Sequence, residues 1–241
     1  MPIYCISDLH LSETSKDTLT LFLNFLTSQV KQSDELYILG DFFNVWVGDD
    51  HNPPYVRTIK ATLSKLTKQG IPIFLMHGNR DFLIGNRFLK ATGCQLIPDP
   101  YVAKFYGQNI LLTHGDLLCY HDHAYQRFRT LVQHPLSQWL FLKFPLWLRL
   151  FIAYKIRQNS QKQQFKNTKK WKICKKIVAQ ILRKYKSTQM VHGHTHLPKV
   201  YNFTLDNAPS KRFILGNWHE HAEILICRQK DFKLHPLRVS L

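Results

Sequence analysis

Metal-binding side chains stand directly after five short apolar runs of the sequence. The five motifs are Asp8-Leu9-His10, Gly40-Asp41, Gly78-Asn79-Arg80-Asp81, Thr113-His114-Gly115-Asp116 and His192-Gly193-His194-Thr195-His196. Carboxylate, amide and imidazole donors without a thiolate suit Mn, Fe or Zn better than an all-oxygen Mg or Ca site. Two divalent ions explain the set most simply, because a bridging carboxylate, here Asp41, holds two cations about 3.5–4 Å apart. The residues alone leave the choice among these three metals open.

Each motif by itself has an ordinary structural explanation. Gly-Asp and Gly-Asn-Arg-Asp commonly form turns, and an isolated Asp-x-His is more often structural than functional. Gly-His-x-His is more specific, since two such histidines behind a glycine are an unusual choice for packing. The occurrence of all five motifs in order, each after an apolar run, favours one shared site.

The apolar runs predict buried strands. They cover 3–6, 36–39, 71–76, 109–112, 189–191 and 213–215, and several are rich in β-branched residues. Helical periodicity over 18–30 and 55–68 separates the first three runs. Alternating strands and helices indicate an α/β fold, in which ligands bind beyond the carboxyl ends of the strands.

The charge of the chain is concentrated in one segment. The 241 residues include 33 Lys and Arg against 16 Asp and Glu, a formal net charge of +17. No acidic residue lies between Asp122 and Asp206, and residues 123–205 hold 17 of the basic ones, so the rest of the chain is balanced. A basic excess of this size can indicate a nucleic-acid binder. The same segment also holds an apolar stretch, 139–154, which is poorly suited to a wet nucleic-acid groove.

Residues 122–170 interrupt the strand–helix alternation. We expect a single domain over 1–241 with a helical lid insertion at about 122–170, and we expect the polar run 158–170 to be a mobile loop. The 16-residue stretch 139–154 contains Lys143, Pro145 and Arg149, and it is short for a membrane span, which needs about 20 apolar residues. Its basic residues favour an interfacial position at an anionic membrane.

The cysteines and the N-terminus favour an intracellular setting. Five cysteines without a CxxC pair are typical of reduced thiols in the cytosol. The first residues show no basic start and no long apolar run, so we expect no secretory signal. Residues 216–221 contain two histidines, which leaves open either a second metal site or a turn that closes the core.

The ordered motifs resemble those of the calcineurin-like metallophosphoesterases over 8–196, most of the chain. The resemblance implies a four-layer α/β/β/α sandwich with a dinuclear metal site at the sheet edge. It assigns the first metal to Asp8, His10, Asp41 and His196. It assigns the second metal to Asp41, Asn79, His114 and His194. His192 falls outside the motif and is expected to pack or to support the ligands.

One motif departs from most of that superfamily, which has His where this chain has Arg80. Arginine stays charged and is a poor general acid, but it stabilises phosphate charge well. A proton donor matters most when an alkoxide leaves, whereas a phosphate is already a stable leaving group. Arg80 therefore fits cleavage of a diphosphate.

Within the superfamily, the sequence is similar to the UDP-2,3-diacylglucosamine pyrophosphatase family of lipid A biosynthesis. The similarity lies in the extended motifs Ser7–Leu11, Tyr37–Asp41, Trp46–Asp50, His77–Leu83, Thr113–Cys119 and His192–His196, and in the position of the insertion. It implies water attack at the α-phosphorus of UDP-2,3-diacylglucosamine, which gives UMP and 2,3-diacylglucosamine 1-phosphate (lipid X). It also implies a monomer bound peripherally to the cytoplasmic face of the inner membrane, with no nucleic-acid partner.

The same similarity implies specific roles for residues at the site. Asp41, Arg80 and His194 are the expected catalytic residues. The expected substrate contacts are Asn79, Arg80, Asp122, Ser160 and His194. The family usually has Asn and then Lys shortly after the lid serine, where this chain has Gln164, Lys166 and Asn167, so Lys166 either substitutes for the family lysine or that contact is lost. The alternatives are another dinuclear-metal phosphodiesterase or phosphatase and, from a different class, a nucleic-acid binder.

Overall fold

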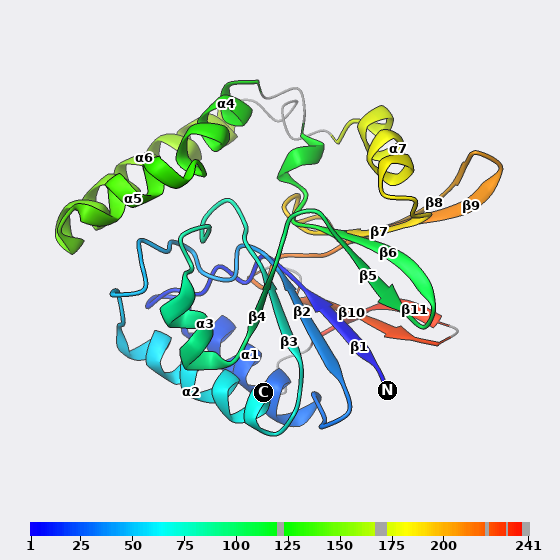
Figure 1. The fold of residues 1–241 in the computed structure, drawn as a ribbon, viewed down its shortest axis with the longest axis horizontal. Coiled ribbons are helices and arrows are strands. Elements are labelled where there is room, and N and C mark those ends of the chain that lie inside the picture. Colours follow the sequence, from blue (N-terminus) through cyan, green and yellow to red (C-terminus); the bar gives the residue numbers. More distant parts are fainter. Residues whose placement is uncertain (120–122, 167–172, 220–221, 230, 238–241) are drawn as a thin grey trace.

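Two β-sheets form the centre of the computed structural model, which describes residues 1–119, 123–166, 173–219, 222–229 and 231–237 (Figure 1). The first sheet has the order β11-β10-β1-β2-β3-β4 and the second has the order β5-β6-β7-β9-β8. The first sheet comprises β1 (Ile3–Ile6), β2 (Glu35–Leu39), β3 (Ile73–Met76), β4 (Gln95–Ile97), β10 (Glu223–Arg228) and β11 (Asp231–Pro236). The second comprises β5 (Tyr101–Phe105), β6 (Gln108–Thr113), β7 (Gln189–His192), β8 (Lys199–Leu205) and β9 (Ala208–Ile214).

Parallel strands at the centre of both sheets direct the motifs to one edge. In the first sheet β1, β2, β3 and β4 are parallel, and in the second β6, β7 and β9 are parallel. Every residue of β1 is buried, as expected for a strand covered on both faces. The carboxyl ends of β1, β2, β3, β6 and β7 therefore carry the five motifs to neighbouring loops.

Helices cover the outer face of each sheet and complete four layers. Helices α1 (Lys16–Ser28), α2 (Pro54–Lys68) and α3 (Asn86–Thr92) lie on the first sheet, and α7 (Lys175–Lys184) lies on the second. Phe22 of α1 and Leu63 of α2 are among the fully buried side chains. Leu39 and Phe105 pack between the sheets, and Leu182 packs α7 onto the second sheet. This α/β/β/α arrangement confirms the fold expected from the motifs.

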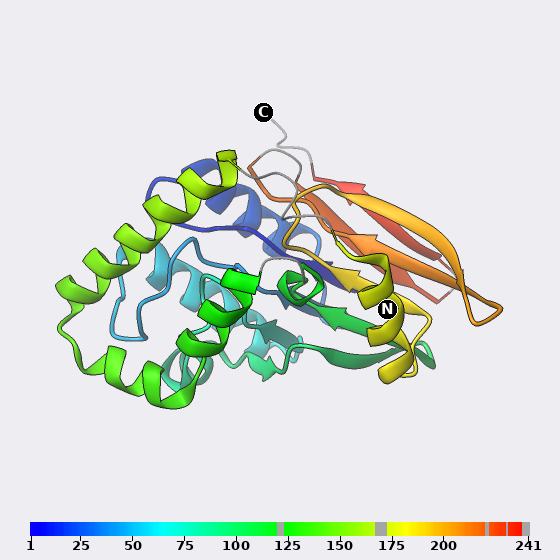
Figure 2. The ribbon, with the colours of Figure 1, turned by 90° about the horizontal axis from the view of Figure 1, so that it is seen from above.

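Three helices between β6 and α7 project over the carboxyl ends of the strands (Figures 1 and 2). They are α4 (His123–Val132), α5 (Pro135–Lys143) and α6 (Leu146–Lys166), and we call them the helical arm. The expectation of a loop from residue 158 is wrong for 158–166, because α6 continues to Lys166. That stretch contains neither Gly nor Pro and is rich in Gln and Lys, which favour helix. Within the described part of the chain, no helix is both long enough and apolar enough to cross a membrane.

Candidate metal centre

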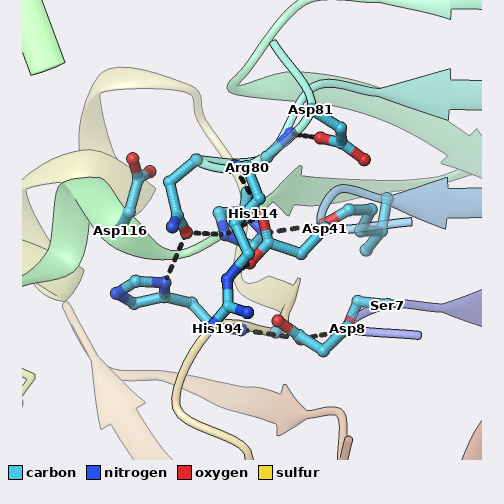
Figure 3. Close-up of polar contacts among 12 residues, drawn as sticks. Ser7, Asp8, Asp41, Arg80, Asp81, His114, Asp116 and His194 are labelled. Carbon is cyan, nitrogen blue, oxygen red and sulfur yellow. Dashed lines mark hydrogen bonds and ion pairs between the residues drawn. The ribbon is translucent and has the colours of Figure 1, made fainter. Parts of the chain in front are cut away.

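Side chains from both sheets converge at the edge where the parallel strands end (Figure 3). The backbone is unusual at this point, because five non-glycine residues there have positive φ angles, from 50° to 68°: Asp8, His10, Asp41, His194 and His196. Such conformations are uncommon for residues with a Cβ atom and persist only where the surrounding structure holds them. Their concentration at one place indicates a functional site.

Asp8, His10 and His196 form the first group of candidate ligands. The Nε2 atoms of His10 and His196 lie 3.2 Å apart, and Asp8 Oδ1 lies 3.4 Å from His196 Nε2. The other carboxylate oxygen of Asp8 accepts hydrogen bonds from the Ser7 hydroxyl at 2.7 Å and from the His194 backbone N–H at 2.8 Å. The second oxygen is thus held by the protein, and Oδ1 is directed at the two imidazoles.

Asp41 lies between this group and a second one. Its Oδ2 is 3.8 Å from His10 Nδ1, and its Oδ1 is 3.7 Å from His114 Nε2. Arg80 binds the same carboxylate through its backbone N–H, 3.0 Å from Oδ1, and through Nε, 3.2 Å from Oδ2. Gly78 permits this approach, since a Cβ atom there would lie 2.2 Å from the Asp41 nitrogen. The position of Asp41 is the one expected of a bridging ligand.

Asn79, His114 and His194 form the second group. Asn79 Oδ1 lies 2.8 Å from His114 Nε2 and 3.1 Å from His194 Nδ1. His114 Nδ1 lies 3.0 Å from the Leu39 carbonyl oxygen, which orients the ring with Nε2 toward Asp41. An imidazole that donates one N–H to a backbone carbonyl and presents its other nitrogen to the site is the usual arrangement of a metal-ligating histidine.

The charges at the site favour a cation. Burial opposes the charged form of His114, yet the carboxylates of Asp41, Asp8, Asp116 and Asp99 raise its pKa to about 9. Burial lowers the pKa of His194 to about 3, so this ring is neutral at pH 7. A buried cluster that draws a proton onto one histidine has the electrostatic character of a cation site.

The donor set fits divalent metal ions. Within the described residues, the buried atoms Asp8 Oδ1 and His10 Nδ1 have no hydrogen-bond partner. Buried polar atoms rarely lack a partner, and a bound ion would provide one. Asp8, His10 and His196 can converge on one point, and so can Asp8, Asp41 and His114. The residues are oxygen and nitrogen donors without a thiolate, as the sequence motifs indicated.

Two further motif residues support the site instead of presenting ligand atoms to it. His192 is completely buried, and its Nδ1 lies 2.9 Å from the Gly193 carbonyl oxygen, which matches the expected packing role. Asp81 accepts backbone N–H groups of Gly78 at 2.8 Å and of Phe42 at 2.7 Å. Asp81 thereby ties the loop after β3 to the loop after β2.

Only some of the expected substrate contacts meet at this edge. Asn79, Arg80 and His194 do, whereas Ser160 lies exposed on α6. Gln164 and Lys166 belong to the last turns of α6, where only the backbone is described. Asp122 and Asn167 lie outside the described residues. Residues 216–219 follow β9 and end in a turn, with the indole of Trp218 buried in the core.

The sequence reasoning missed residues that no short motif marks. Arg157 of α6 donates from Nη1 to the Asn44 carbonyl oxygen at 3.3 Å, and Asn44 Oδ1 accepts from Arg80 Nη1 at 3.1 Å. Burial and the nearby Arg80 lower the pKa of Arg157 to about 10, so it remains charged at pH 7. In the sequence Arg157 is one of many basic residues, and only the path of α6 brings it here.

The start of the helical arm is held by a second network. Asp116 Oδ2 accepts hydrogen bonds from the Tyr125 hydroxyl at 2.8 Å and from Arg129 Nε at 2.7 Å. The Tyr125 ring lies 6.5 Å from that of His194. The aspartate of the His-Gly-Asp motif therefore attaches α4 beside the second ligand group.

Comparison with known proteins assigns the chain to a family. The family model described as calcineurin-like phosphoesterase matches residues 1–198. The chain therefore belongs to the calcineurin-like phosphoesterases, a class of metal-dependent hydrolases. A solved archaeal phosphodiesterase is similar at 12% identity with a TM-score of 0.49, over 98% of this chain and 100% of that chain.

Curated relatives narrow the class. A UDP-2,3-diacylglucosamine hydrolase of Aeromonas hydrophila is 41% identical over 95% of both chains. Relatives with the same name from Pseudomonas entomophila and Serratia proteamaculans are 40% and 43% identical, over 99% and 91% of this chain and 100% and 92% of theirs. Within its class, the chain belongs to the family of these hydrolases.

Proposed function

We propose that this chain hydrolyses the diphosphate bond of UDP-2,3-diacylglucosamine by water attack at the α-phosphorus. The products are UMP and 2,3-diacylglucosamine 1-phosphate, a step of lipid A biosynthesis. The main support for the proposal is that Arg80 and Arg157 both bind Asn44, beside a cluster of candidate metal ligands. The relatives named for this hydrolase activity support the choice of substrate.

We propose two Mn²⁺ ions for the centre. Asp8, His10, Asp41 and His196 would hold the first ion, and Asp41, Asn79, His114 and His194 would hold the second. When bound, such ions activate water and neutralise phosphoryl oxygens. The mixed carboxylate, amide and imidazole set is the basis for preferring Mn²⁺ to Mg²⁺.

Arg80 and Arg157 would bind and orient the diphosphate. Both guanidinium groups donate hydrogen bonds to Asn44. Two positively charged groups this close together favour binding of an anion beside them. Guanidinium groups bind phosphate oxygens through paired N–H donors. The neutral ring of His194 offers a lone pair or a neutral N–H to the site. Stabilisation of developing charge therefore falls mainly on the two arginines.

The helical arm is the proposed lid for the acyl chains and the proposed membrane contact. Many of its large apolar side chains are exposed, among them Leu131, Leu136, Trp139, Trp147 and Phe151. So many exposed apolar side chains on one segment indicate a binding function. We place the protein peripherally on the cytoplasmic face of the inner membrane, as a monomer whose single domain carries the arm as an insertion at about 122–170.

A direct assay tests the proposed function. The purified chain, stripped of metal and reloaded with Mn²⁺ or Mg²⁺, is incubated with UDP-2,3-diacylglucosamine in detergent. In H₂¹⁸O we expect UMP that carries the label and unlabelled 2,3-diacylglucosamine 1-phosphate. Soluble nucleotide diphosphates serve as competing substrates. Equal turnover of a soluble nucleotide sugar, or label in the lipid product, would contradict the proposal and favour another phosphodiesterase activity.

A further inference from the structure

The side chain of Arg149 attaches the middle of the helical arm to the segment that follows β2. Arg149 lies in the first turn of α6 and is only 3% exposed. Its Nε donates to the Phe144 carbonyl oxygen at 2.9 Å, and Nη1 donates to the Val47 carbonyl oxygen. Nη1 and Nη2 together bind both carboxylate oxygens of Asp50, the first at 2.9 Å. This arginine therefore does not face a membrane surface, in contrast to the sequence-based expectation.

Burial of an arginine is unfavourable unless its donors are paired. The planar fork of Arg149 meets the Asp50 carboxylate in a bidentate arrangement, which is strong and directional. The neighbouring Gly48 provides the space, because a Cβ atom there would lie 2.4 Å from Arg149 Nη1. Gly48 also has φ +135°, a conformation that residues with a Cβ atom rarely adopt. The loop is shaped to receive a guanidinium group.

The receiving loop is itself fixed to the rest of the site. Asp49 accepts the Trp46 indole N–H at 3.1 Å and the backbone N–H groups of Gly85 and Phe88 at 3.0 Å. The backbone N–H of Trp46 donates to the Arg80 carbonyl oxygen at 3.1 Å. Arg149 is thus attached to a loop that contacts both α3 and the backbone of Arg80.

Helix α6 connects this attachment to the metal centre. Arg157 lies eight residues after Arg149, which is about 12 Å and little more than two turns along a helix. Its guanidinium binds the Asn44 carbonyl oxygen, only a few residues before the loop that binds Arg149. Two arginines of one helix therefore hold α6 across the segment that follows β2.

We propose that Arg149 is a positioning residue: its bidentate bond with Asp50 holds α6 so that Arg157 lies over the centre and the exposed apolar side chains of the arm are presented at a set angle. It does not touch the reacting groups. The inference rests on the proposed function for its effect on the lipid substrate, but the attachment of α6 can be measured without that substrate.

The test compares Arg149→Gln, Asp50→Asn and the double variant in the full-length chain loaded with Mn²⁺. For UDP-2,3-diacylglucosamine we expect kcat/KM to fall about tenfold or more in each single variant, because misplacement of a binding group by about an ångström has effects of this size or larger. The double variant should be no worse than Arg149→Gln, since both changes break one interaction. Arg149→Lys, which keeps the charge but not the fork, should restore part of the loss.

Three readouts separate positioning from general damage. Mn²⁺ affinity and hydrolysis of bis(p-nitrophenyl) phosphate, a small diester that does not need the arm, should change less than about twofold. Amide hydrogen exchange of 146–157 should become about tenfold faster or more, because the attachment opposes local opening. The matched control is Arg183→Gln, which breaks the bidentate but exposed pair of Arg183 with Asp206. It should leave all four measurements unchanged.

Each result decides the inference. Unchanged exchange of 146–157 in Arg149→Gln would overturn it, as would an equal loss of small-diester hydrolysis and Mn²⁺ binding. Additive losses in the double variant would also overturn it. If the wild-type chain does not hydrolyse the lipid nucleotide, the proposed function fails, and hydrogen exchange alone then supports or refutes the attachment by Arg149.

Discussion

At the scale of single residues, Asp41 lies between the two groups of candidate ligands. Its carboxylate faces His10 on one side and His114 on the other, at 3.8 and 3.7 Å, and Arg80 approaches both oxygens. Burial raises the pKa of this carboxyl group, which is the behaviour of an acid held among ligands and away from solvent. A change at Asp41 should therefore affect both groups of ligands at once.

Replacement of Asp41 by Asn should abolish turnover without unfolding the chain. The amide keeps the volume but loses the charge that a bridging ligand provides, so we expect kcat to fall roughly a thousandfold, about 4 kcal/mol at the transition state. Metal content measured by mass spectrometry should fall in parallel. Asp17→Asn, on the exposed start of α1, is the control. Full metal content together with wild-type turnover in Asp41→Asn would refute the bridging role.

The contacts of single arginines also change the interpretation of the net charge. Three arginines of the segment without acidic residues bind acids from outside it: Arg129 binds Asp116, Arg149 binds Asp50 and Arg183 binds Asp206. Two of these three arginines attach the helical arm. Part of the basic excess therefore serves to hold the arm in place.

At the scale of elements, the helical arm is attached at separate points. Asp116 holds α4 through Tyr125 and Arg129, and Asp50 holds the start of α6 through Arg149. Both acids are near the carboxyl ends of strands, and both basic partners belong to the arm. These ion pairs hold the arm, while many of its apolar side chains remain exposed.

The attachment at Asp50 should depend on pH in a defined direction. The hydrogen bond from Arg149 lowers the pKa of Asp50 below its ordinary value. A carboxyl group with a lowered pKa in the folded state stabilises that state above its unfolded pKa, near 3.9, and loses this contribution as the pH falls toward the folded value. The stability that Asp50→Asn loses should thus be constant from about pH 8 to 5 and should shrink below about pH 4.

Urea unfolding of the wild type and Asp50→Asn at several pH values measures this dependence. The same pair compared in an Arg149→Gln background is the control, and it should show little difference at any pH. A stability difference that persists unchanged to pH 3 would mean that Asp50 acts through something other than its charge.

At the scale of the whole molecule, the chain presents two kinds of surface. The strand ends carry the proposed metal centre, and the helical arm next to them carries exposed Trp139, Trp147 and Phe151 together with Lys143 and Lys155. Aromatic side chains beside basic ones are typical of a peripheral contact with an anionic membrane. The placement of this surface beside the site suits a substrate that is anchored in the membrane.

Binding to vesicles that contain anionic lipid should depend on these aromatic residues and on salt. Trp147→Ser and Trp139→Ser should each weaken binding about tenfold, because each removes apolar area that inserts at the interface. An increase in NaCl from about 0.1 to 0.5 M should weaken wild-type binding further by screening the basic residues. Sedimentation of the protein with vesicles measures both effects.

Tyr201→Ser provides the control for vesicle binding. Tyr201 is also a partly exposed aromatic residue, but it lies on β8 of the second sheet, away from the arm. Its replacement should leave the vesicle affinity unchanged. An equal loss in Tyr201→Ser and Trp147→Ser, or binding that ignores both salt and the two tryptophans, would remove the arm as the membrane contact.

Local features of this protein could be predicted from the sequence. Short apolar runs rich in β-branched residues predicted the buried central strands, and the polar residues that follow these runs predicted a metal site. Largely exposed strands, such as β8, carry a weaker pattern and were not predicted. The helical continuation of α6 to Lys166 was also missed, because a polar helix and a polar loop have similar composition.

The pairing of charged side chains, in contrast, depends on the tertiary structure. Arg149, Arg157 and Lys143 look alike along the chain, yet one is buried against Asp50, one lies beside Arg80 and one is near Trp139. Their environments depend on how the arm crosses the strand ends, and this path is set by contacts between residues about 100 positions apart. Chemistry that follows from residue type is readable in sequence, whereas chemistry that follows from burial and pairing requires the folded chain.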